Sequence, residues 1–173
     1  MSAAPAVPGY DCTVDELMVV ELARRFDNTT RAFNGAVSFI PVCAYLLARA
    51  THAPELVWAA SSIAIDPHPP RIPESTLSDS LWDGAVALSN SPFDFWAWAQ
   101  GGHYNTFAFR GAQIDRYGNV NNTVIGPYES PKVRLPGGGG MADLSCMIPR
   151  IFLWSTNASA RSARIRPCDS EAR

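Results

Sequence analysis

The chain has 173 residues, a formal net charge of −2 and 47% hydrophobic residues, which suffices for one sizeable core. Only 17% of the residues are charged and no basic stripe runs along the sequence, so we expect no nucleic-acid partner. The most apolar run, residues 35–48, is interrupted by Ser38 and Pro41 and is too short to span a bilayer. These properties predict a soluble protein without a membrane partner.

The first part of the chain predicts an arm followed by a helix. Residues 1–12 begin Ala- and Pro-rich, lack the basic start and apolar core of a signal peptide, and are expected to form a disordered arm. Thr13 and Glu16 form the S/T-x-x-E pattern that caps a helix start. Apolar residues at helical spacing then predict a helix that ends near Phe26.

The next segments predict a strand, a helix and a second strand. Residues 32–39 are apolar and flanked by breakers, which is typical of a buried strand. Pro41 suits the first turn of a helix that runs to about Thr51, and residues 56–60 predict another buried strand. This order indicates a βαβ unit and therefore a parallel sheet.

The middle of the chain is less regular. Residues 65–92 contain prolines at 67, 69, 70 and 73, which predict a long irregular loop at their start. Residues 93–100 (FDFWAWAQ) predict a helix ended by Gly101 and Gly102, and its aromatic residues favour a core or subunit interface over a ligand site. Residues 105–109 are the next strand candidate.

A motif follows, which reads FRGAQIDRYGNVNNTVIGPYESPKVRLPGGGGMADL from Phe109. Residues 112–115 are expected to end a strand, and Tyr117-Gly118-Asn119 to make a tight turn in which glycine takes positive φ. Residues 123–126 predict a short strand back. Four consecutive glycines, residues 137–140, either present bare N–H groups to a phosphate or oxyanion, or form a flexible hinge.

Together, AQID-x-YGN-x-N, PK-x-R and GGGG-M-A-D-L resemble the β-subunits of family I CoA-transferases, especially those similar to glutaconate CoA-transferase. The resemblance is near-continuous over residues 111–144 and weaker but collinear back to about Val14. It implies an α/β fold with an open, largely parallel sheet flanked by helices. It also implies an active site shared with an α-type subunit, where CoA moves between carboxylic acids.

The resemblance carries over to individual residues. Gly137, Gly138, Gly139 and Gly140 match the glycine loop that closes on the bound CoA thioester in this family. Asp115, Asn119 and Asn121 match its Asp-x-x-Gly-Asn-x-Asn turn. We expect the two asparagines to contribute to the CoA site, mainly by shaping the loop, because Asn and Asp commonly bond to their own backbone in turns.

The family's nucleophile is a glutamate, which attacks the acyl-CoA to form an anhydride and then an enzyme–CoA thioester. Its position falls on Ser61, and no glutamate lies within WAASS at residues 58–62, so the catalytic residue stays unknown. Ser61 would itself need a base, for which His52 and His68 are near only in sequence. Glu74, beyond the proline-rich stretch, is a further carboxylate. In some related acyl-CoA hydrolases that open steroid rings, the carboxylate belongs to the α-type chain.

The C-terminal part departs from the family pattern. Residues 148–156 (IPRIFLWST) predict a strand, after which NASARSARIRPCDSEAR loses apolar periodicity. We expect residues 13–156 to form an incomplete CoA-transferase β-type domain that lacks C-terminal strands, and residues 157–173 to form a disordered or aberrant tail. One hypothesis for this tail is a shifted reading frame near codon 157.

The four cysteines, at positions 12, 43, 146 and 168, form no CxxC pair, and no histidine is close enough to suggest a zinc site, so we expect no metal. Reduced thiols in a cytoplasmic protein are the simplest interpretation.

The sequence thus predicts the β-type component of a CoA-transferase with an α-type partner, acyl-CoA and carboxylic acid as substrates, and no permanently bound cofactor. The alternatives are a component of a hydrolase and a non-catalytic truncated remnant. Fold analogy adds a sugar-phosphate isomerase, which the YGN-x-N and glycine motifs disfavour.

Overall fold

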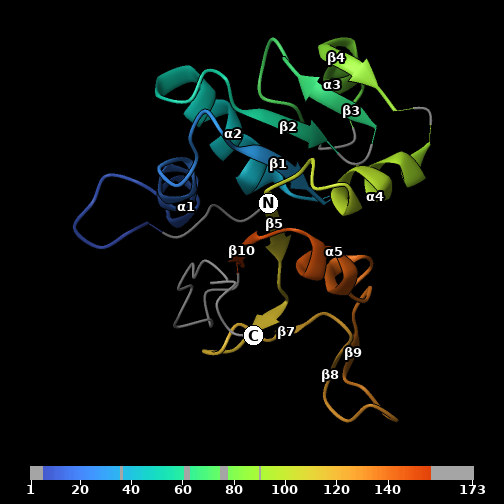
Figure 1. Cartoon of the computed structure of the whole chain (residues 1–173). Coiled ribbons are helices and arrows are strands. Elements are labelled where there is room, and N and C mark those ends of the chain that lie inside the picture. Colours follow the sequence, from blue (N-terminus) through green and yellow to red (C-terminus); the bar gives the residue numbers. More distant parts are fainter. Residues whose placement is uncertain (1–5, 36, 61–62, 75–77, 90, 157–173) are drawn as a thin grey trace.

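The computed structural model describes residues 6–35, 37–60, 63–74, 78–89 and 91–156. A six-stranded sheet with the order β10-β5-β1-β2-β3-β4 forms its centre (Figure 1). The parallel strands are β1 (Arg31–Asn34), β2 (Val57–Ala60), β5 (Thr106–Arg110) and β10 (Arg150–Trp154). Antiparallel pairing adds β3 (Ala64–Pro67) and β4 (Ala85–Leu88). The predicted α/β fold with a largely parallel sheet is confirmed.

Helices cover both faces of the sheet. On one face lie α1 (Val14–Ala23) and α2 (Phe39–Thr51), which bury a core with Trp58, Phe152 and Trp154 of the strands. On the other face lie α4 (Pro92–Gln100) and α5 (Met141–Met147), which bury Phe33, Phe107 and Ile151. The short α3 (Asp79–Asp83) contributes Leu81 to the first core. None of the helices in the described ranges has the length and apolar character needed to cross a membrane.

Residues 111–140, here called the arm, extend away from the sheet between β5 and α5 (Figure 1). The arm holds two small antiparallel ladders. The first joins β6 (Gln113–Ile114) to β7 (Val120–Asn121), and the second joins β8 (Val124–Ile125) to β9 (Val133–Arg134). The strand predicted at residues 123–126 therefore exists, but β7, and not β8, returns to pair with β6.

The predicted βαβ unit is confirmed, because β1 and β2 are parallel neighbours joined through α2. The predicted capping box is also present: Glu16 N donates to Thr13 Oγ1 at 3.2 Å, and Thr13 N donates to Glu16 Oε2 at 2.7 Å. The prediction of one strand over residues 32–39 was wrong at its end, since β1 stops at Asn34 and α2 begins at Phe39. A short apolar run does not distinguish a buried strand from the first turn of a buried helix.

The irregular loop predicted to begin at residue 65 was wrong, because β3, α3 and β4 lie within residues 64–88. Pro67 ends β3, where its missing N–H costs the sheet little. Asp66 takes a φ of +47°, and its carboxylate lies 3.1 Å from Arg49 Nη2 of α2. Arg49 also donates to the carbonyl of Pro67 at 3.0 Å. Contacts with Arg49 of α2, which lies outside the local sequence of the strand, thus fix a strand that this local sequence disfavours.

The predicted helix at residues 93–100 and the strands at 105–109 and 148–156 are confirmed as α4, β5 and β10. In the N-terminal segment that was predicted to be disordered (residues 1–12), residues 6–12 form a turn that closes with an isolated bridge between Ala6 and Thr13. Residues 1–5 and the predicted tail, residues 157–173, lie outside the described residues. The domain limits at 12, 13, 156 and 157 stay a prediction.

Candidate functional site

Four parallel strands end at the same edge of the sheet, and this edge carries the arm. In open α/β sheets, ligands bind outside the carboxyl ends of the strands. The arm leaves β5 at Gly111 and returns through α5 to β10, so both of its ends are anchored to adjacent strands. The sequence motif therefore lies at the edge where this fold forms its sites.

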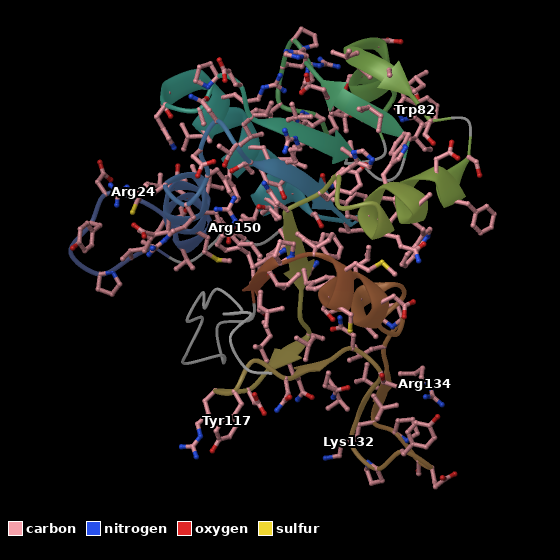
Figure 2. The ribbon with its side chains drawn as sticks, viewed as in Figure 1. Arg24, Trp82, Tyr117, Lys132, Arg134 and Arg150 are labelled. Atoms are coloured by element: carbon pink, nitrogen blue, oxygen red, sulfur yellow. The ribbon has the colours of Figure 1, made fainter. Side chains whose placement is uncertain are left out.

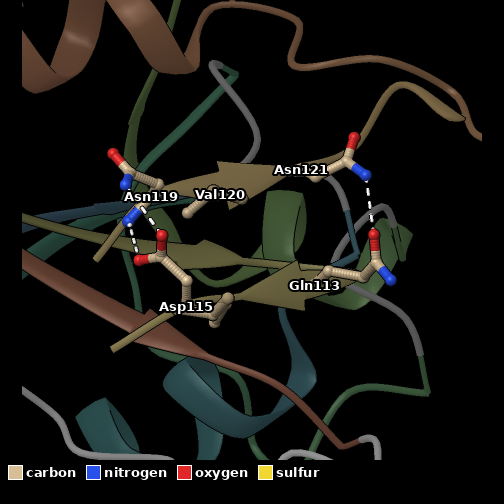
Figure 3. A pocket seen from close by; sticks show the side chains of 6 residues that line it. Gln113, Asp115, Asn119, Val120 and Asn121 are labelled. Carbon is tan, nitrogen blue, oxygen red and sulfur yellow. Dashed lines mark hydrogen bonds between the residues drawn. The ribbon is translucent and has the colours of Figure 1, made fainter. Parts of the chain in front are cut away.

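Asp115 organises the turn between β6 and β7 (Figure 3). Its Oδ1 accepts from the backbone N–H of Tyr117 at 2.8 Å and of Asn119 at 2.9 Å, and its Oδ2 accepts from Asn119 Nδ2 at 2.8 Å. Gly118 takes the predicted positive φ, at +87°. The hydrogen bond from the Asn119 side chain is the main cause that lowers the pKa of Asp115 below its ordinary value of 3.8. The carboxylate is therefore held ionised to shape the turn.

The Asn121 side chain also forms hydrogen bonds that shape the arm. Its Nδ2 donates to Gln113 Oε1 and to the carbonyl of Val124, both at 2.7 Å, and its Oδ1 accepts from Thr123 N at 3.0 Å. An open hollow of about 300 Å³ lies here, lined by the six residues Gln113, Ile114, Asp115, Asn119, Val120 and Asn121. The hydrogen bonds at Asn119 and Asn121 stay within the arm and support a shaping role. A direct contact with CoA stays a prediction.

Asn122 is a site residue that sequence reasoning missed. Its Oδ1 accepts from Ala112 N at 2.7 Å, and its Nδ2 donates to the carbonyl of Arg110 at 3.0 Å and to Met141 Sδ at 3.2 Å. One carboxamide thus joins the end of β5 to the start of α5. Three asparagines within four residues were the available clue, but nothing in the sequence separates Asn122 from its neighbours.

The four glycines, residues 137–140, differ in what their positions require. Gly137 and Gly139 have φ values of +93° and +51°, which non-glycine residues rarely adopt. An added Cβ at Gly140 would lie 2.6 Å from Trp96 Cζ2 and closer still to Cη2, so a side chain there would require the loop or the indole to shift. Gly138 has neither a positive φ nor any atom within 4 Å of an added Cβ. The fold of the described chain therefore does not explain glycine at position 138.

The loop continues the ladder of the arm. Leu135 N donates to the carbonyl of Thr123 at 3.0 Å, and Gly137 N donates to the carbonyl of Asn122 at 2.8 Å. Beyond Gly140 the chain enters α5, where Leu144 is buried. At the outer end of the arm, Tyr117, Lys132 and Arg134 lie away from the sheet (Figure 2). The glycine loop is thus held at both ends, while Gly138 faces open space.

Ser61, which the sequence resemblance predicts to stand at the family's glutamate position, lies outside the described residues and follows β2 in the sequence. The two histidines considered as a base for Ser61 lie at the edge of the sheet where the parallel strands begin, and not at their carboxyl ends. His52 follows the end of α2 and contacts the carbonyls of Ala23 and Phe26 at 3.1 Å. His68 follows β3, which runs antiparallel to β2, and lies 3.2 Å from Asp66 Oδ2. The structure does not bring either histidine to the carboxyl end of β2.

The other sequence candidates within the described ranges are Glu74 and three cysteines. The Glu74 side chain is 86% exposed and lies 3.9 Å from Arg71 Nη2. Cys12, Cys43 and Cys146 are free thiols, and burial raises the pKa of Cys43. Within the part of the chain that the structure describes, no three His, Cys, Asp or Glu side chains are grouped to hold a metal.

The model of the coenzyme A transferase family matches residues 72–162, which is more than half of the chain. The chain belongs to the coenzyme A transferase family. It is 38% identical over 137 residues to the β-subunit of 3-oxoadipate CoA-transferase from Pseudomonas knackmussii, a match that covers 77% of this chain and 50% of that protein. Over 30 residues, 17% of this chain and 11% of that protein, it is 67% identical to the β-subunit of glutaconate CoA-transferase from Acidaminococcus fermentans.

Two solved structures are similar over most of the chain. The decarboxylase AibA/AibB matches with a TM-score of 0.74 and 33% identity, over 83% of this chain and 59% of that one. Glutaconate CoA-transferase from Acidaminococcus fermentans matches with a TM-score of 0.72 and 25% identity, over 84% and 56%. These likenesses confirm the family and the α/β fold. The chain spans about half the length of the 3-oxoadipate relative and just over half of the solved chains.

Proposed function

We propose that this chain is the β-type part of a heteromeric CoA-transferase, in which it acts with an α-type chain on an acyl-CoA thioester. The single observation that carries the proposal is Gly138, a glycine that neither backbone conformation nor packing requires. A missing side chain on an open loop lets a ligand approach the backbone closely. The family match and its position at the carboxyl edge of the sheet support acyl-CoA as this ligand.

The chemistry assigned to the loop is electrostatic. When a nucleophile attacks a thioester, negative charge develops on the carbonyl oxygen, and backbone N–H groups in a glycine-rich loop stabilise such an oxyanion. Asp115 and Asn122 keep the arm in shape, so the N–H groups need little rearrangement when substrate binds. Transfer also needs a carboxylate nucleophile, and residues 57–62 contain none. In this proposal the α-type chain supplies it.

The missing glutamate favours a second candidate function. A decarboxylation of an acyl-CoA needs no carboxylate nucleophile, and the decarboxylase AibA/AibB is 33% identical to this chain with a TM-score of 0.74. Thioester hydrolysis with a carboxylate from the partner is the other alternative. In this proposal the three reactions would share the glycine loop and differ in the product that leaves.

The test is an acyl-CoA panel incubated with this chain after co-expression and co-purification with an α-type CoA-transferase chain. Three quantities are measured with and without acetate: the loss of thioester absorbance, the release of free thiol, and the release of CO2. Conversion to acetyl-CoA only with acetate supports transfer. Free CoA without acetate indicates hydrolysis, and CO2 release with an intact thioester indicates decarboxylation. A stable complex that leaves every acyl-CoA unchanged would refute the enzyme proposal and favour the remnant.

A further inference from the structure

One contact at the site joins Gly140, the last glycine of the loop, to the indole of Trp96. Trp96 lies on α4, far from the glycine loop in sequence, and is half-buried. A Cβ added at Gly140 would meet three atoms of the six-membered ring of this indole, namely Cη2, Cζ2 and Cζ3, the last at 3.2 Å. The backbone of the loop therefore lies directly on the outer part of the Trp96 ring.

The helix that carries Trp96 is fixed to the centre of the sheet. Phe95, the neighbouring residue, stacks on Phe33 of β1 with ring centroids 3.8 Å apart and also contacts Tyr104 at 5.8 Å. The Trp96 ring lies 5.4 Å from the Phe95 ring. A continuous set of aromatic contacts thus runs from the central strand β1 to the last glycine of the loop.

The other end of the loop is held by hydrogen bonds and not by rings. Gly137 N donates to Asn122 O at 2.8 Å, while Gly138 and Gly139 have open space where a Cβ would stand. Of the two anchors, Trp96 is the one that connects the loop to α4, the helix that shares a face of the sheet with α5. Removing it would leave the far end of the loop held by α5 alone.

We propose that Trp96 is a positioning residue for the proposed acyl-CoA site: its indole sets the height of the glycine loop above the carboxyl edge of the sheet. This inference rests on the proposed function and adds to it a residue from outside the glycine motif. It also gives a reason for glycine at position 140, where the ring leaves no room for a side chain. Trp96 acts through the loop and touches no reacting atom.

A size-exchange experiment on the co-purified complex tests this. Phenylalanine lacks the fused six-membered ring whose three atoms a Cβ at position 140 would meet. Gly140→Ala alone should raise KM for acyl-CoA about tenfold or more, because the loop must shift away from the ring. Trp96→Phe alone should raise it only a few-fold. The double variant should recover most of the loss caused by Gly140→Ala, which is a non-additive outcome.

Trp98→Phe is the matched control. Trp98 is a half-buried tryptophan of the same helix, and none of its atoms is among the three nearest to a Cβ added at Gly140. It should not rescue Gly140→Ala. Rescue by Trp96→Phe but not by Trp98→Phe, seen in KM with similar unfolding midpoints, supports the positioning role. Equal effects of the two phenylalanine variants, or strictly additive losses, would overturn it.

The same exchange separates this inference from the proposed function. If the wild-type complex acts on no acyl-CoA, the proposed function fails. The contact is then tested through hydrogen exchange of the amides at positions 137–141, which Gly140→Ala should accelerate and Trp96→Phe should restore. If the wild-type complex is active and no rescue appears in either measurement, only the role of Trp96 is rejected.

Discussion

The sheet with its helices and the arm are held in shape by different interactions. In the sheet, aromatic side chains pack against one another: Phe33 stacks on Phe95 at 3.8 Å, and Phe26 meets Phe152 edge-on at 5.5 Å. In the arm, the two tyrosines are exposed, Tyr117 at 73% and Tyr128 at 63%. Amide and carboxylate groups, together with glycine conformations, determine its course.

This difference separates stability from function. Burial of apolar area dominates folding free energy, so substitutions in the sheet should change the global free energy of unfolding. The arm buries little apolar surface, and substitutions there should change local order or substrate binding while the unfolding midpoint stays nearly constant. We therefore expect the arm, which carries the proposed chemistry, to contribute less to the stability of the chain than the sheet does.

The largest expected effect comes from Phe33→Ala in β1. Phe33 is 5% exposed and contacts the rings of Phe95, Tyr104 and Phe107. The substitution leaves a cavity and should reduce the free energy of unfolding by about 3–5 kcal/mol. Denaturant unfolding followed by circular dichroism measures this loss. Tyr117→Ala, which removes an exposed ring from the arm, is the control and should stay within about 0.5 kcal/mol of wild type. Equal losses in both variants would contradict the expected difference in stability contribution between the sheet and the arm.

Asn122→Ala comes next and acts on the arm alone. The variant removes the hydrogen bond that Asn122 Oδ1 accepts from Ala112 N and both bonds that the carboxamide donates to Arg110 and Met141. Local opening of the arm should become easier by about 1–3 kcal/mol, because each lost hydrogen bond contributes about 0.5–1.5 kcal/mol net. Hydrogen exchange of amides at residues 112–124 should accelerate about tenfold or more, with little change in β1 and β5. Protection lost equally across the sheet would show that the arm and the sheet unfold together.

The sequence predicted the sheet better than the arm, for a physical reason. The apolar runs at β2 and β5 and the capping box at Thr13 are local signals, and the structure contains all three. The strand β3 escaped prediction because Asp66 and Pro67 disfavour it locally. Arg49, on α2, holds this strand through contacts that no local pattern reveals.

The site was predicted in part. The turn at Gly118 follows from residue type, because glycine adopts positive φ without steric cost. The role of Asn122 depends on three partners between positions 110 and 141, and only the folded arm brings them together. The contact of Trp96 with Gly140 is likewise a product of the packing of α4 against the loop. Sequence reasoning therefore found the residues with local roles and missed those that join distant segments.

Gly138→Ala tests the function assigned to the arm and should have a smaller effect. A Cβ at this position meets no atom within 4 Å, so the unfolding midpoint of the complex should not change. If acyl-CoA approaches this backbone, KM should rise about tenfold, equivalent to about 1.4 kcal/mol of lost binding. Gly137→Ala provides the contrast: with φ at +93°, it should disturb the loop itself and raise both KM and local hydrogen exchange. An unchanged KM in Gly138→Ala would show that acyl-CoA does not approach this backbone closely, and it would refute the interpretation of Gly138 on which the proposed function rests.

The smallest expected effect is the pH response of the turn at Asp115. Hydrogen bonds from Asn119, first from its side chain and then from its backbone, lower the pKa of this carboxyl below 3.8 in the folded chain. Because the folded-state pKa is the lower one, the stabilisation of the turn is fully present above the ordinary pKa and disappears as pH falls through the folded value. The Asn119 amide resonance, followed by NMR as pH is lowered, should therefore shift with a midpoint below 3.8, and Asp115→Asn should abolish that transition. Since the carboxyl is exposed and belongs to the arm, the amides of β1 should keep their protection through this step. If they lose protection at the same pH, the arm is coupled to the sheet more tightly than its hydrogen bonds imply.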